Sequence, residues 1–147
     1  MRNILFLLVL FLVACVDVAE TTGFDAAVPR ADSITCNTAY RPGASVPIER
    51  EETFTLADED AQQKVNFNDL VFHAQYNSGR LDNERALRLW VTEPEETAEF
   101  NSQLYQFPLD SGPVNQFTGG HGFTGLNYVY HPSSNAELQF WCVASEQ

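Results

Sequence analysis

Histidines are the side chains of this chain best suited to acid–base chemistry or metal binding, and there are three: His73, His121 and His131. No two have the close spacing that places a pair of ligands on one strand or helix face, and no HExxH motif occurs. No serine lies in a Gly-x-Ser-x-Gly turn. The sequence therefore favours a protein without catalysis, metal or cofactor, and a small hydrolase or metal-dependent enzyme that uses these histidines is the alternative.

Acidic side chains are the other candidate metal ligands. Residues 58–60 are all acidic, and Asp82 and Glu84 lie in a second polar segment. Loops of this kind at the end of a sheet can supply the oxygen ligands that calcium prefers. Neither segment has the Asp-x-Asp-x-Asp-Gly spacing of a calcium-binding loop, so the sequence favours two solvated acidic loops.

Aromatic side chains indicate a possible ligand surface. Trp90 and Trp141 alternate with aliphatic residues along two expected strands, which places their rings on the opposite strand faces. Exposed rings can stack on sugars or anchor a protein partner, and Tyr76 and Tyr105 could extend such a platform.

Residues 117–125 are the most unusual segment, because glycines alternate in it with aromatic residues and His121. Glycines let a ligand approach the backbone closely, and they also let a crowded corner of a sandwich turn; the second role is favoured. The segment lacks the lysine of a phosphate-binding loop. The possible ligand-binding residues are Trp90, Trp141, His121 and Tyr128.

Alternation of apolar and polar residues with a period of two predicts strands along most of the chain after residue 33. The expected strands cover residues 34–36, 51–56, 70–76, 87–92, 102–107, 123–130 and 138–143. Turn-forming residues separate them, including a hairpin loop at 131–135. About seven strands in one domain, residues 33–147, predict an all-β fold, an antiparallel β-sandwich of immunoglobulin-like type.

Two segments depart from this pattern. Thr92, Pro94 and Glu95 are the N-cap, first-turn proline and capping-box residue of a helix start, and apolar residues follow at spacings of four and three. These features predict a short helix at 93–101 that runs into a strand. Residues 82–86 could form one helical turn before the next strand.

Cys36 and Cys142 lie near the two ends of the domain, in phase with apolar neighbours on their strands. Without a CxxC motif or a nearby histidine pair they make a poor zinc site. A disulfide between them would close a loop of roughly 100 residues, for which the chain-entropy model gives on the order of 4.7 kcal/mol. The sequence therefore predicts a disulfide that joins the terminal strands.

The remaining cysteine ends a different kind of segment. Arg2 precedes an apolar run from Ile4 to Val13, which is shorter than the roughly 20 residues that a transmembrane helix needs. The run closes on Leu12-Val13-Ala14-Cys15, which resembles the lipobox of bacterial lipoproteins, where a peptidase cuts before the cysteine and its thiol carries diacylglycerol. The resemblance covers these first residues alone and implies a signal peptide at 1–14 and lipidation of Cys15. The residues that follow are polar, small and aperiodic, with Gly23 and Pro29 as breakers, and predict a tether at 15–32.

An ordinary signal peptidase is the alternative, because Val18 and Ala19 before Glu20 would suit it and a soluble secreted protein would result. Both routes place the domain outside the cytoplasm, where disulfides form. The chain carries 8 Lys and Arg against 20 Asp and Glu, a net charge of −12, so its surface would repel nucleic acid.

Together these features predict a lipid-anchored cell-envelope protein that is a monomer and acts as a binding or structural module. Its partner would be an envelope protein or a glycan, in addition to the membrane that holds the lipid. A carbohydrate-binding module that uses exposed tryptophan and tyrosine is an alternative function.

Overall fold

The computed structural model describes residues 33–57, 61–78, 85–108, 113–117 and 119–145. The expected signal peptide, Cys15 and the tether lie outside the described residues, as do the acidic segments at 58–60 and 82–84. In the described parts of the chain, no helix is long and apolar enough to cross a membrane.

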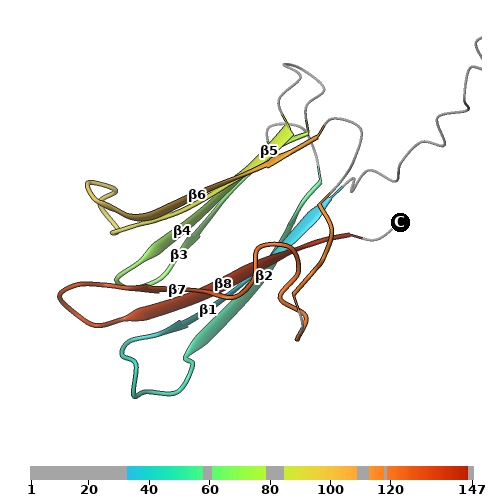
Figure 1. The fold of residues 1–147 in the computed structure, drawn as a ribbon. Helices are drawn as coiled ribbons and strands as arrows, with labels where there is room; N and C mark the ends of the chain where they lie inside the picture. The colour runs from blue at the N-terminus through green and yellow to red at the C-terminus, as the bar shows by residue number, and fades with distance from the viewer. Residues whose placement is uncertain (1–32, 58–60, 79–84, 109–112, 118, 146–147) are drawn as a thin grey trace, which may run out of the picture.

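Among the described residues, eight antiparallel strands form two sheets of four, which pack as the two layers visible in Figure 1. One sheet has the order β2-β1-β8-β7 and the other the order β3-β4-β5-β6. The strands are β1 (Ile34–Arg41), β2 (Arg50–Leu56), β3 (Ala61–Asn66), β4 (Val71–Ser78), β5 (Arg85–Thr92), β6 (Glu99–Phe107), β7 (Asn127–Tyr130) and β8 (Glu137–Ala144). The predicted all-β antiparallel sandwich is confirmed.

The strand order does not confirm the immunoglobulin-like type. Immunoglobulin sheets place strands side by side that are not consecutive in the chain, through Greek-key connections. Here each strand lies beside the strand that precedes or follows it in the chain. The exception is the pairing of β1 with β8, which brings the first and last strands side by side. The fold is therefore an antiparallel meander folded into two layers, with its first and last strands joined.

The core lies between the layers and follows the predicted alternation. In β4 and β5 the inward side chains include Phe72, Tyr76 and Leu89, and in β8 they include Phe140, all of them buried. The rings of Phe72 and Phe140 lie 5.0 Å apart between centroids and so join the two sheets. Burial of one apolar row per strand is the force that fixes the register of each pair.

The disulfide is present, and it joins neighbouring strands of one sheet. Cys36 of β1 lies directly opposite Cys142 of β8, with 4.1 Å between their Cα atoms, and both residues are completely buried. The bridge therefore fastens the strand pair that closes the meander.

The expected helix at 93–101 is wrong. Residues 94–96 form a turn in which the Glu96 N–H donates to the Glu93 carbonyl (2.9 Å), and β6 begins at Glu99. Glu96 has a φ of +57°, a left-handed conformation that ends any helical path. Pairing of β6 with β5 supplies more hydrogen bonds than a short isolated helix could retain. Arg85 and Ala86, expected in a helical turn, belong to β5.

The hairpin loop at 131–135 is confirmed. The His131 N–H donates to the Ala136 carbonyl (2.8 Å), and Asn135 adopts the left-handed conformation, with a φ of +58°. The His131 Nδ1 accepts hydrogen bonds from the Ser133 and Ser134 N–H groups, so this ring is part of the turn.

The two ends of the sandwich differ in what they carry. Ser33 and Ser145 are joined by two hydrogen bonds, so the chain enters and leaves the domain at one end. The four hairpins that connect β1–β2, β3–β4, β5–β6 and β7–β8 lie at the other end (Figure 1). A tether before Ser33 would therefore leave these hairpins farthest from its attachment point.

Candidate ligand-binding face

The outer face of the β2-β1-β8-β7 sheet brings together two exposed tyrosines and a half-buried tryptophan. Leu138, Phe140 and Cys142 point into the core, so Gln139 and Trp141 of β8 point outward. On β7, Val129 is buried whereas Tyr128 and Tyr130 are 48% and 52% exposed. Tyr128 lies opposite Gln139, and Tyr130 lies opposite Glu137. We call the surface formed by Tyr128, Tyr130, Gln139, Trp141 and Asn37 the aromatic face.

Neutral hydrogen-bonding groups lie beside the rings. Asn37 of β1 lies opposite Trp141, and its Oδ1 accepts a hydrogen bond from Thr53 of β2 (2.9 Å). Gln139 donates from Nε2 to Glu137 Oε1 (2.6 Å), which orients the amide. The face thus combines apolar ring surface with amide groups held by strands, an arrangement suited to a polar ligand that has apolar faces.

A buried ion pair holds one edge of the aromatic face. Glu137 is fully buried although it lies on the outward row, and its Oε2 is 2.6 Å from Nη2 of Arg41 on β1. Burial acts to raise the pKa of Glu137, but hydrogen bonds from Arg41, Gln139 and Tyr130 outweigh it and lower the pKa. Burial and the Glu137 carboxylate raise the pKa of the Tyr130 hydroxyl, which bonds to that carboxylate. The pair therefore fixes the positions of Tyr130 and Gln139.

The glycine-rich segment holds the other edge of the face. The rings of His121 and Trp141 pack in a T-shaped arrangement, with centroids 5.4 Å apart at an angle of 86°. Gly122 has a φ of +61°, and a Cβ there would lie 2.1 Å from the Cys142 carbonyl oxygen. The Cys142 N–H donates to Thr124 Oγ1 (2.8 Å), and the Phe123 N–H donates to the Cys142 carbonyl (3.2 Å). This close approach explains the glycine at 122, and the hydrogen bonds hold the glycine-rich segment against β8.

Three of the four predicted ligand-binding residues come together here: Trp141, His121 and Tyr128. The fourth, Trp90, lies on the outer face of the other sheet. Its ring stacks on His73 with centroids 4.8 Å apart, and the Arg88 guanidinium lies 4.6 Å from its centroid. Trp90 is half-buried between these neighbours and belongs to no common surface with the other three.

The two further tyrosines do not extend a platform. Tyr76 is buried in the core, because it lies on the inward row of β4. Tyr105 is half-buried against the core and donates its hydroxyl to Gln103 Oε1 (2.7 Å). Tyr130, Gln139 and Asn37 are the members of the aromatic face that sequence reasoning missed. Tyr130 shares a strand face with Tyr128 in the predicted alternation, and Gln139 shares one with Trp141.

The histidines lie in separate environments. His73 is buried, its Nε2 is 3.1 Å from Thr92 Oγ1, and burial lowers its pKa. His131 belongs to the β7–β8 turn, where Phe100 packs edge-on against it. Within the described ranges, no group of three or more His, Cys, Asp or Glu side chains could hold a metal ion.

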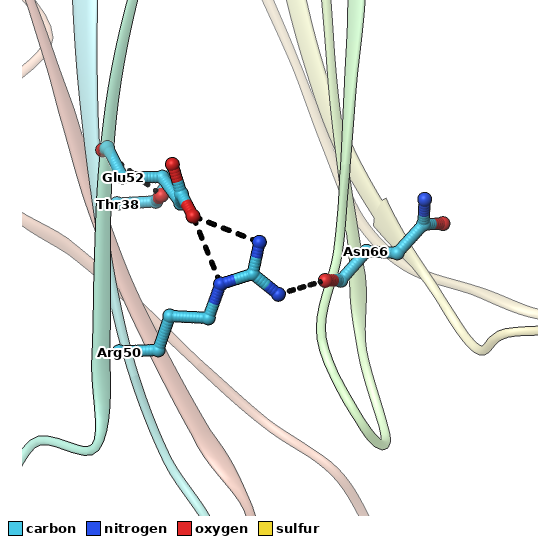
Figure 2. A network of polar contacts seen from close by, with 4 residues as sticks. All are labelled: Thr38, Arg50, Glu52 and Asn66. Carbon is cyan, nitrogen blue, oxygen red and sulfur yellow. Dashed lines mark hydrogen bonds and ion pairs between the residues drawn. The ribbon is translucent and has the colours of Figure 1, made fainter.

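Arg50 has a structural contact at the open side of the sandwich, where β2 and β3 face each other (Figure 2). Its Nε and Nη2 donate to Glu52 Oε1 (2.9 and 2.8 Å), and its Nη1 donates to the Asn66 carbonyl (2.8 Å). The guanidinium also lies 5.3 Å from the Phe67 ring centroid. The contact links the two sheets across this side, and all three guanidinium nitrogens of Arg50 are used in it.

Comparison of the chain with family models, curated proteins and solved structures finds no match.

Proposed function

We propose that the protein is a lipid-anchored binding module of the cell envelope, without catalysis, and that the aromatic face is its ligand-binding surface. The anchor rests on the resemblance of residues 12–15 to a lipobox. The buried Cys36–Cys142 disulfide agrees with a domain outside the cytoplasm. The observation that carries the binding role is the gathering of Tyr128, Tyr130 and Trp141 beside amide groups on one sheet face.

A neutral glycan is the ligand that this chemistry fits best. Sugar rings have apolar C–H faces that stack on aromatic rings and hydroxyl edges that bond to amides, and the aromatic face presents both kinds of group. Arg41 is already paired with Glu137, so the described residues of the aromatic face offer no unpaired arginine or lysine for a phosphate or an acidic sugar. The net charge of −12 further disfavours an anionic ligand.

The lipid anchor is tested by Cys15→Ser. We expect the unaltered protein to sediment with membranes and to incorporate a labelled fatty acid, because thiol-linked diacylglycerol would hold it there. The variant should lose the label and appear in the soluble fraction. Membrane association that is unchanged by the substitution would contradict the anchor.

Glycan binding is tested by screening the protein on an array of neutral and acidic oligosaccharides, followed by calorimetry of the best binder. Tyr128→Ala should weaken binding by about tenfold, since loss of a central aromatic contact costs roughly 1–2 kcal/mol. Tyr128 is suited to this test because it is exposed and makes no hydrogen bond to the buried ion pair.

Val114→Ala is the matched control, because Val114 is an apolar residue, 74% exposed, outside the aromatic face. It should leave the Kd unchanged. Failure of every oligosaccharide to bind, or binding that Tyr128→Ala does not weaken, would overturn the glycan proposal. Binding of an envelope polypeptide that Tyr128→Ala abolishes would replace the glycan with a protein ligand on the same face.

A further inference from the structure

The sandwich has four edge strands, β2 and β7 in one sheet and β3 and β6 in the other. An edge strand presents unpaired N–H and C=O groups to which another strand can add. Natural sheets prevent this with short strands, with charged residues, especially lysine, or with proline and bulges. Comparison of the four edges therefore shows which one is open to pairing.

Three of the edges carry such protection. β2 contains Arg50, Glu51 and Glu52, and β3 contains Lys64 at its centre. β7 is short, with four residues. Each of these strands would bring charge or too few hydrogen bonds to an added strand.

β6 is the exception. It is the longest strand, with nine residues, and Glu99 at its start is its one charged residue. The irregularity in its pairing with β5 lies at Val91 and Thr92, near that start, so residues 101–107 pair in continuous register. Leu104, on its outer face, is 60% exposed. The Oδ1 of Asn101 is buried and has no hydrogen-bond donor among the described residues.

We propose that β6 pairs with β6 of a second copy of this chain to form an antiparallel dimer. The proposal goes beyond the proposed function and does not depend on it. We choose a second copy as the partner because β6 can pair with β6 of that copy in an antiparallel register centred on Gln103. In this register Gln103 of one copy lies opposite Gln103 of the other. In that register Glu99 of each copy lies opposite Phe107 of the other, so no like charges meet.

The same register buries the exposed leucine. Leu104 of each copy lies opposite Ser102 of the other, so the two Leu104 side chains become diagonal neighbours about 7–8 Å apart on one face. The four-stranded sheets would join into one sheet across a two-fold axis, the commonest symmetry of soluble dimers. The aromatic face stays open in both copies, because it lies on the other sheet.

Net charge sets the conditions under which the dimer forms. Each chain carries −12, so the two copies repel each other at low ionic strength. Salt screens this repulsion, and raising NaCl from about 50 to about 500 mM shortens the screening length from roughly 14 to 4 Å. The dimer should therefore become tighter as salt increases, which is opposite to an association driven by ion pairs.

Sedimentation equilibrium of the purified Cys15→Ser protein tests the proposal. We expect a reversible dimer at micromolar to millimolar concentration in 500 mM NaCl and a weaker one in 50 mM NaCl. Leu104→Lys should weaken the dimer by about tenfold or more, because lysine protects edges and two ammonium groups would lie close together. Val46→Lys is the matched control with the same charge change, because Val46 is 42% exposed in the β1–β2 hairpin of the other sheet. Its Kd should stay within about twofold of the parent value.

Amide hydrogen exchange locates the contact. Protection of residues 99–107 should increase with protein concentration in the parent protein and remain constant in Leu104→Lys. A protein that is monomeric at every concentration and salt tested would overturn the proposal. A dimer that survives Leu104→Lys, or whose protected residues lie outside β6, would also overturn it.

Discussion

Replacement of Cys36 by alanine is expected to lower the free energy of unfolding by about 4 kcal/mol, and Cys142→Ala should lower it by the same amount. The disulfide closes a loop whose ends are 106 residues apart in sequence. For a loop of about 100 residues the chain-entropy model gives roughly 4.7 kcal/mol, and measured losses in small secreted domains run from about 2 to 5 kcal/mol.

The decisive measurement is a double-mutant cycle by urea denaturation in the Cys15→Ser background. The double variant should be no less stable than either single variant, because each substitution removes the same bond. Addition of a reductant should destabilise the parent to the level of the variants and leave the double variant unchanged. Losses that add in the double variant would contradict a shared bridge.

The loss should begin at the strand pair that the bridge joins. β1 and β8 are the first and last strands, and their pairing closes the meander and supports Trp141 next to Cys142. Exchange of the β1 and β8 amides should therefore accelerate more than exchange of the β4 and β5 amides in the other sheet. Uniform acceleration across both sheets would show that the bridge acts on global stability alone.

Strands that bury one row of side chains were predictable from the sequence. The expected strands at 70–76, 87–92 and 138–143 correspond to β4, β5 and β8, with boundaries that differ by one or two residues. Each places apolar residues at every second position, and the opposite sheet covers them. The periodicity in the sequence thus arises directly from the packing of these side chains in the core.

The misassigned segments failed for two different physical reasons. β3 was not predicted, because this edge strand is polar apart from Ala61 and the buried Val65, so no alternation marks it. At 93–101, the irregular pairing near Glu99 places Phe100 against the core alongside Phe107. The helical spacing also included Leu104, which is 60% exposed on the outer strand face, so that spacing did not reflect the packing.

The candidate site was predictable only in part. Alternation along one strand indicates that Trp141 points away from Cys142, and the structure agrees. It cannot indicate that Arg41 meets Glu137, because the two are 96 residues apart and charged residues at strand ends ordinarily face solvent. Long-range pairing of β1 with β8 creates that contact, and a single sequence carries no local signal of it.

Arg41→Met is expected to lower the free energy of unfolding by about 3 kcal/mol at pH 7. Removal of one partner of a buried ion pair costs roughly 3–5 kcal/mol, because an uncompensated charge stays buried. The lower value applies here because the Arg41 side chain is 24% exposed and Gln139 and Tyr130 still bond to the carboxylate. Arg88→Met is the control, because it breaks an ion pair whose side chains are both exposed. It should cost about 1 kcal/mol or less, which includes loss of the guanidinium contact with the Trp90 ring.

The pH dependence shows whether the cost comes from the buried carboxylate. In the parent protein the pKa of Glu137 is lowered, so its contribution is present above the unfolded value of about 4.3 and is lost as the pH falls through the folded value. Without Arg41, burial becomes the stronger influence and should raise that pKa, so the folded variant takes up a proton more readily than the unfolded chain.

The difference in unfolding free energy between parent and Arg41→Met should therefore shrink as the pH falls from 7 to about 4. Urea denaturation at several pH values measures it, and Arg41→Met/Glu137→Gln should show a smaller loss at pH 7 with little pH dependence. A difference that stays constant across this range would mean that Arg41 stabilises the sheet by packing its side chain rather than by neutralising Glu137. In that case the ion pair would not be what holds Tyr130 and Gln139 in the aromatic face.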